Sequence, residues 1–217
     1  MKMWVVFHLS PRLRHIGHLD LMRSMQRALR RSGLPVSYSQ GFSPHILLSL
    51  AAPLSVGMSG EREVMEVPLS LPASENDFQH RLQEALPEGI QIVKCLLKED
   101  VLPAPMAALW AAQYVFRFTE DARPLLDQVA AFMAKEEVPA VRKGKKGEVR
   151  FNLRPLVYNL IVKEDALHAT LALSEKGTAK PDIVIKALAE LAGVPAPHYI
   201  ATRAQLLDAA FAPLENR

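Results

Sequence analysis

Cysteine is nearly absent from this chain of 217 residues, which contains Cys95 and no other thiol. A single cysteine cannot form an intrachain disulfide, and it cannot supply the cysteine cluster that holds an iron–sulfur centre. Cys95 lies in the apolar run Ile90–Leu97. We therefore predict a buried and unreactive thiol rather than a nucleophile.

Long hydrophobic runs and the common enzyme motifs are missing as well. The apolar run at the start of the chain ends at Phe7, which is too short for a signal peptide or a membrane span, so we expect a cytoplasmic protein without membrane contact. The chain has no nucleophile elbow, no phosphate-cradling glycine loop and no dinucleotide fingerprint. We predict no bound cofactor.

Acidic residues are scarce in the first 60 positions, where Asp20 stands alone against seven basic residues. The segment 61–110 has the opposite balance, with 4 basic and 9 acidic residues, and the segment 142–154 has 6 basic residues and 1 acidic residue. Local patches decide what a surface attracts, so the two basic segments are the candidate binding sites.

The clearest helical pattern runs from residue 18 to residue 32, and Gly33 and Pro35 are expected to end it. An apolar stripe alternates with basic side chains at helical spacing. A solvated helix face is one interpretation, but such faces usually mix charges of both signs, which favours phosphate binding. The predicted stripe is Leu19, Met22, Met25, Gln26 and Leu29, and the basic residues are Arg23, Arg27, Arg30 and Arg31.

The loop SQGFSPH, residues 39–45, follows this helix. Gly41 permits a positive φ, Pro44 removes a donor, and Phe42 is an aromatic residue among polar neighbours. Phe42 could stack on a ligand, or it could enter the core and leave the loop as a simple connection. The sequence leaves both alternatives open.

The run HLDLMRSMQRALRRSGLPVSYSQGFSPHILLSLAAPLSVGMSGE closely resembles an uncharacterised radical-SAM-associated family. Its members occur as separate chains or as the C-terminal part of a radical SAM protein with a cobalamin-binding-type domain. The resemblance is strong over about residues 5–70 and loose beyond them. It implies a radical SAM partner that acts on RNA, and it assigns no catalytic residue. With one cysteine, this chain is not itself the radical SAM catalyst.

Strand and helix patterns predict an α+β fold of two tandem ferredoxin-like (βαββαβ-type) sandwich units, residues 1–102 and 110–217. The join is marked by Pro103 and Pro105. The first unit should contain the helix 18–32, a helix from Ser74 and the strands 3–9, 36–39, 46–51, 64–69 and 90–97. The second should contain the helices 124–137 and 181–191 and the strands 113–119, 139–142, 148–153, 156–162, 167–173 and 199–206.

The hairpin RKGKKGEVRFNLR is the second basic site, and its density of positive charge suits phosphates. An edge strand whose lysines discourage aggregation is the alternative. Two basic sites in related units predict one groove for folded or single-stranded RNA. The basic residues are Arg142, Lys143, Lys145, Lys146, Arg150 and Arg154.

His15 and His18 lie three residues apart, which suggests a metal site or an acid–base pair. No cysteine is near them in the sequence and Asp20 is the only carboxylate there, so we predict no metal site. They remain weak candidates for catalytic residues.

The leading hypothesis is a non-catalytic, RNA-binding accessory subunit that presents RNA to a radical SAM enzyme. One alternative is a metal-independent endoribonuclease that uses His15 or His18. The other is a protein-docking module for the radical SAM enzyme without RNA contact. The predicted RNA-binding residues are Arg12, Arg14, Arg23, Arg27, Arg30, Arg31, Gln40, Phe42, His45, Arg142, Lys143, Lys145, Lys146, Arg150 and Arg154.

Overall fold

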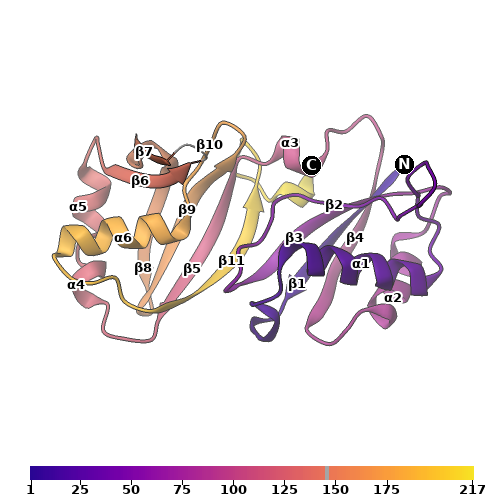
Figure 1. Cartoon of the computed structure of the whole chain (residues 1–217), viewed down its shortest axis with the longest axis horizontal. Coiled ribbons are helices and arrows are strands. Elements are labelled where there is room, and N and C mark those ends of the chain that lie inside the picture. The colour runs from indigo at the N-terminus through magenta and orange to yellow at the C-terminus, as the bar shows by residue number, and fades with distance from the viewer. Residues whose placement is uncertain (145–146) are drawn as a thin grey trace. The chain divides into compact units, whose positions relative to one another are not determined.

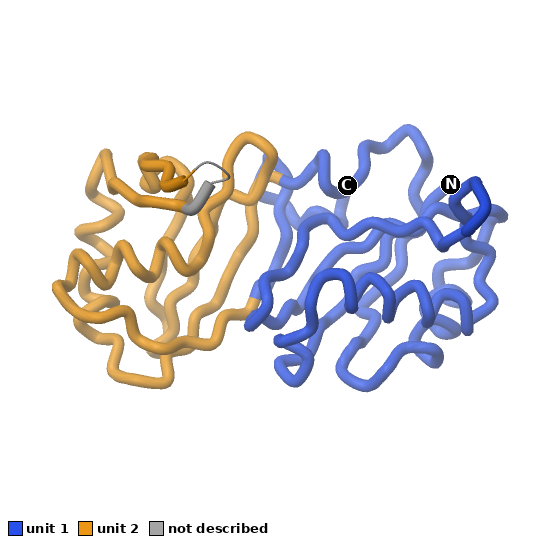
Figure 2. The backbone as a smooth tube through the Cα atoms, in the orientation of Figure 1, with its two compact units in different colours: residues 1–109, 203–217 blue, residues 110–202 orange. Residues whose placement is uncertain are grey.

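The computed structural model describes residues 1–144 and 147–217, and the side chains at 143 and 144 are outside the description. The chain forms two compact units, residues 1–109 with 203–217 and residues 110–202 (Figure 2). The first division falls close to the join expected from Pro103 and Pro105. The segment 203–217 belongs to the first unit, although the sequence placed it in the second.

The first unit is an antiparallel sheet with two helices, α1 and α2, packed on one face (Figure 1). Strand β1 lies between β3 and β4, and both β2 and β11 pair with β3. The elements are β1 (Lys2–Leu9), η1 (Pro11–Leu13), α1 (His18–Ser32), β2 (Ser49–Leu50), β3 (Met58–Pro68), α2 (Glu75–Ala85), β4 (Ile90–Lys98), α3 (Pro105–Ala108), η3 (Leu214–Asn216) and the end of β11 (Tyr199–Leu207).

The second unit is built around β9, which pairs antiparallel with β5 on one side and with β8 and β10 on the other. The start of β11 lies beside β5, and β6 and β7 form a separate two-stranded sheet. The elements are β5 (Ala111–Phe118), α4 (Arg123–Leu126), α5 (Val129–Ala134), β6 (Pro139–Gly144), β7 (Gly147–Asn152), η2 (Arg154–Leu156), β8 (Val157–Lys163), β9 (Ala166–Ser174), β10 (Gly177–Thr178) and α6 (Pro181–Ala192).

The predicted α+β class is confirmed, and several elements differ from the prediction, among them β3, which begins at Met58 and not at residue 64. The helix expected over 124–137 is divided into the two short helices α4 and α5. The Gln128 N–H donates to the Leu125 carbonyl three residues back, and α5 begins at Val129. The strands expected over 36–39 and 46–51 shrink to β2 and isolated bridges. There the Ser37 N–H donates to the Pro68 carbonyl, and the Ser37 carbonyl accepts from the Leu47 N–H. The segment therefore pairs with each of its two neighbours only at an isolated bridge.

The helical face of the first sheet holds the main core of that unit. Successive side chains of a strand point to opposite faces, and every second residue of β1 from Met3 to Leu9 packs under the helices. The buried side of α1 matches the predicted stripe only in part: Met25 and Leu29 are buried, but Leu19 is 65% exposed. Leu21 and the small Ala28 are buried although the prediction left them out. The full buried set on α1 is Leu21, Met25, Ala28 and Leu29.

The opposite face of that sheet carries polar groups that satisfy one another. The indole Nε1 of Trp4 donates to Glu66 Oε2 at 3.0 Å, and Lys2 Nζ lies 3.1 Å from the same oxygen. Lys98 Nζ lies 5.2 Å from the centre of the Trp4 ring. Burial, followed by the nearby charge of Lys94, lowers the pKa of Lys98 from its ordinary value.

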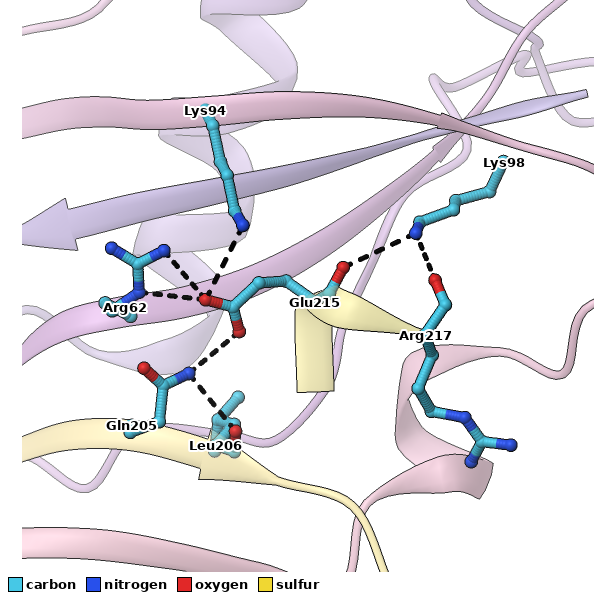
Figure 3. A network of polar contacts seen from close by, with 7 residues as sticks. All are labelled: Arg62, Lys94, Lys98, Gln205, Leu206, Glu215 and Arg217. Atoms are coloured by element: carbon cyan, nitrogen blue, oxygen red, sulfur yellow. Dashed lines mark hydrogen bonds and ion pairs between the residues drawn. The ribbon is translucent and has the colours of Figure 1, made fainter. Parts of the chain in front are cut away.

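Glu215, almost completely buried, ties the C-terminal segment to this face (Figure 3). Its carboxylate accepts bonds from Arg62 and Gln205 at 2.8 Å, and Lys94 lies at 3.9 Å. Lys98 donates to the carbonyls of Glu215 and Arg217. Strands β3, β4 and β11 therefore all hold the last residues of the chain, which explains why 203–217 belong to the first unit.

A second buried ion pair fixes β11 within the same unit. Arg203 donates to Glu63 through Nε at 2.8 Å and Nη2 at 2.5 Å, and also to the carbonyls of Ala52 and Pro53. The side chains of Arg203 and Glu63 are 3% and 5% exposed. Removal of one charge would therefore leave the other buried without a counter-ion.

We predict that Arg203→Met destabilises the first unit by about 3 kcal/mol or more, because Glu63 then stays buried without a counter-ion. The measurement is urea unfolding followed by Trp4 fluorescence in a Trp110→Phe background. The control is Arg123→Met, which removes an exposed pair with Asp121 and should leave the midpoint unchanged. Equal midpoints for the two variants would contradict the structural role of Arg203.

Candidate nucleic-acid interface

The exposed side of α1 carries the arginine face, defined as Arg23, Arg27, Arg30 and Arg31, all of them exposed. Residues three and four apart lie on one side of a helix, so these side chains form one ridge. Arg23 pairs with Asp20 at 3.1 Å, and Arg31 donates to the Ala85 carbonyl at 2.5 Å. The side chains of Arg27 and Arg30 make no hydrogen bond or ion pair with any described residue, and both are exposed, so their charges face solvent.

The C-terminus of α1 is closed by two local devices. Gly33 adopts φ 62°, a left-handed conformation that ends the helix as predicted. Arg81 on α2 donates to the Ser32 carbonyl at 2.7 Å and 3.1 Å, and to Asp77 at 3.1 Å. Arg81 therefore neutralises Asp77 in the first turn of α2. The arginine face does not pair with Asp77.

The loop 39–45 is pinned at its base. The Ser39 N–H donates to the His45 carbonyl at 2.8 Å, the His45 N–H donates to Ser39 Oγ at 3.1 Å, and Ser39 Oγ lies 2.8 Å from His45 Nδ1. Gly41 takes φ 116°, and Phe42 is fully exposed. Of the two alternatives for Phe42, the structure has the exposed one, and His45 closes the loop through its Nδ1 atom and its backbone while its side chain stays exposed.

Gln26 joins the loop to the helix, a connection that the sequence did not suggest. Its Nε2 donates to the Ile46 carbonyl at 3.0 Å, directly after the loop. The position of Gln26 inside an apolar stripe could have indicated this contact, because a buried polar side chain usually has a hydrogen-bond partner. The loop and the arginine face are thus fixed to the same helix.

The other residues predicted in this region have local partners or lie apart. Arg12 pairs with Glu88 at 3.2 Å on the surface, and Arg14 donates to the Pro11 carbonyl at 3.3 Å. His15 is exposed, whereas the Nδ1 atom of His18 is buried without a hydrogen-bond partner among the described residues. Gln40 is exposed on the loop next to Phe42.

In the second unit, the predicted hairpin forms as β6–β7. Arg142 lies 5.2 Å from the Phe151 ring, and Arg150 is exposed opposite Val141. Arg154 has a structural role: its guanidinium donates to the carbonyls of Met133 and Val157 at 2.8–3.2 Å. Lys145, Lys146 and the side chain of Lys143 lie outside the described residues.

The histidines, acidic residues and the single cysteine are the side chains that a metal or thiol site would use. In the described ranges 1–144 and 147–217, no group of three or more histidine, cysteine, aspartate or glutamate side chains could hold a metal ion. Cys95 is buried, and burial with a smaller contribution from Glu75 raises the pKa of its thiol to about 12.

The profile of a bacterial family, described as an uncharacterized protein conserved in bacteria (DUF2344), matches residues 2–181. This chain belongs to that family. The match covers the first unit's helices, the loop and the hairpin. No curated protein matches the chain. Among the described residues, no helix is long and apolar enough to cross a membrane.

Three solved structures are weakly similar to this family member. An unknown protein from Galdieria sulphuraria is 15% identical, with 92% of this chain and 97% of that chain covered and a TM-score of 0.29. Two crystal forms of a heavy metal efflux pump are 11% and 14% identical, with TM-scores of 0.26 and 0.23. They cover 88% and 94% of this chain but 26% and 28% of the pump chain. These scores are too low to support a conclusion about fold or function.

We predict that iodoacetamide leaves Cys95 unmodified in the folded protein at about pH 8, near the ordinary pKa of a free thiol. A pKa raised from 9.0 to about 12 keeps the proton on sulfur and reduces the thiolate about a thousandfold. Mass spectrometry should show modification only after unfolding in urea. Alkylation of the folded chain at the rate of free cysteine would contradict the burial.

Proposed function

We propose that this protein is a non-catalytic, RNA-binding accessory subunit whose contact surface is the arginine face together with the loop 39–45. The observation that carries the proposal is the fully exposed ring of Phe42 on a pinned loop, fixed through Gln26 to the helix that displays Arg27 and Arg30. Arginines without protein partners can neutralise phosphates, and an exposed ring can stack on a base.

Single-stranded RNA fits this combination better than a duplex. Proteins that bind single strands combine a basic track with aromatic side chains, because every unpaired base offers a flat face for stacking. In an RNA helix the bases are stacked on each other and hidden from a ring such as Phe42. An unpaired loop or end of a folded RNA satisfies both parts of the surface.

The radical SAM enzyme enters the proposal as the partner that receives the RNA. The support is the resemblance of the segment around the arginine face and the loop, and the single cysteine, which rules out an iron–sulfur cluster of three thiolates in this chain. A protein-docking module without RNA contact would use the same arginines against an acidic surface. The experiments below separate the two.

We also interpret each unit as a ferredoxin-like sandwich. The support is the strand order. In chain order, β4–β1–β3–β2 in the first unit and β11–β5–β9–β8 in the second both run fourth, first, third and second strand. In this interpretation the β6–β7 hairpin is an insertion before β8, and its Arg142 and Arg150 add a further basic site.

We predict that the double variant Arg27→Ala, Arg30→Ala weakens binding to a fluorescent single-stranded RNA. Each neutralised phosphate contributes about 0.7 to the slope of log affinity against log salt, so the slope should fall by about 1.4. Fluorescence anisotropy between about 50 mM and 200 mM salt measures the change. Circular dichroism should be unchanged, because both side chains face solvent.

The matched control is Arg117→Ala, an exposed arginine on β5 in the second unit, which should leave the slope unchanged. Absence of RNA binding by the wild-type chain, or binding that does not depend on salt, would overturn the proposal. Co-purification with a radical SAM protein that is lost in the double variant but resists nuclease would support the docking module instead.

Phe42 tests the stacking contact separately. We predict that Phe42→Ala costs about 1–3 kcal/mol of binding to the same RNA, the usual contribution of a stacked base, whereas Phe42→Trp retains binding. Neither substitution should lower the unfolding midpoint, because the ring is fully exposed. If Phe42→Ala binds RNA as tightly as the wild type, the loop is not part of the interface.

A further inference from the structure

The outer edge of β4 in the first unit is occupied by side chains instead of a neighbouring strand. β4 is the terminal strand of its sheet, and α2 packs against it (Figure 1). The Gln83 Nε2 donates to the Ile90 carbonyl at 3.3 Å, and the Ile92 N–H donates to Gln83 Oε1 at 2.6 Å. Further along, the Leu97 N–H donates to Glu75 Oε1 at 2.6 Å.

The bonding pattern of Gln83 is that of a parallel strand. In a parallel pair, the N–H of a residue donates to the carbonyl of the residue that precedes its partner on the neighbouring strand. Its own carbonyl accepts from the N–H of the residue that follows that partner. The Gln83 carboxamide does the same around Gln91, through Ile90 and Ile92. A side chain from α2 therefore stands where the peptide group of an added strand would lie.

An open groove of about 850 Å³ lies beside this edge, between the second half of α2 and the start of β4. Amide side chains and carboxylates line it, among them Gln79, Gln83, Glu84, Glu88 and Gln91. Amide groups suit a polypeptide backbone, which has donors and acceptors in equal number. The carboxylates belong to the acidic segment 61–110, and Glu84 and Glu88 are exposed at the groove.

We propose that the outer edge of β4 and this groove bind an extended, basic segment of a partner protein, which adds to the sheet as a parallel strand. Gln83 is the group that the incoming backbone displaces, and Glu75, which already bonds to the edge, is displaced with it. Glu84 attracts lysine or arginine side chains of the segment, and Glu88 does so by exchanging its exposed partner Arg12. This protein-binding site goes beyond the proposed RNA contact, because its carboxylates repel phosphate.

A second copy of this chain is a poor occupant of the same edge. Two copies related by a two-fold axis would pair β4 with β4 in antiparallel orientation, whereas Gln83 reproduces a parallel pair. No side-chain hydrogen bond reaches the backbone of residues 93–96 in the described structure, so the edge between the two occupied points is open to a strand.

The test uses the full-length protein and a short synthetic peptide of alternating lysine and valine. We expect the amide NMR signals of Ile92 and Leu97 to shift as the peptide is added, with saturation and with weaker binding at higher salt. Two control peptides isolate the two contacts. One carries N-methylated backbone nitrogens at every residue and so lacks the donors that a strand needs, and the other replaces lysine by glutamate.

Gln83→Ala should tighten peptide binding about fivefold, because the peptide no longer has to displace a hydrogen-bonded side chain. Gln113→Ala, an exposed glutamine in the second unit, is the matched control and should change nothing. Equal shifts with all three peptides, or no shift of Ile92 and Leu97 in the wild-type protein, would overturn the proposal whether or not Gln83→Ala folds. RNA binding is independent of this result.

Discussion

The burial of one side of α1 against β1 determines the direction in which the arginine face points. Met25, Ala28 and Leu29 on the inner side of α1 are completely buried. Phe7 and Leu9 on β1 are 1% exposed. A helix held along this side cannot rotate without exposing apolar area at about 25 cal/mol per Å². The arginines are therefore held toward solvent by packing that involves none of them.

Buried charges have a different task in the first unit. Glu215 and the Glu63–Arg203 pair connect the end of the chain to strands formed near its beginning. Such pairs add little net stability compared with apolar residues, but they are costly to break and so restrict the alternatives. They bind residues 203–217 to the first unit, whereas the arginine face and the groove at β4 carry charges that remain accessible.

Local patterns in the sequence predicted the two long helices of the first unit and its strands β1 and β4 well, but not the short pairings between residues 36 and 51. The bounds of α1 followed from Gly33 and the helical spacing, and the cap at Ser74 placed the start of α2. The buried stripe was right for Met25 and Leu29 but included the exposed Leu19 and omitted Leu21 and Ala28. The α+β class needed only the order of these elements.

Contacts between distant residues could not be predicted in the same way. Arg154 was expected to bind RNA, but it bonds to the carbonyls of Met133 and Val157, and backbone acceptors leave no trace in a sequence. The ion pair of Glu215 with Arg62 could not be predicted either, because the two residues are 153 positions apart in the sequence. For Phe42 the sequence left two conformations open, because glycine and proline set the loop geometry without setting the direction of the ring.

The most direct test of the central claim is photo-crosslinking of the wild-type protein to single-stranded RNA containing 4-thiouridine, followed by mass spectrometry of the crosslinked peptides. We expect crosslinks at Phe42 and in peptides from α1 between residues 18 and 32. Crosslinks confined to other parts of the chain, or none above those of an unrelated protein of the same charge, would contradict it.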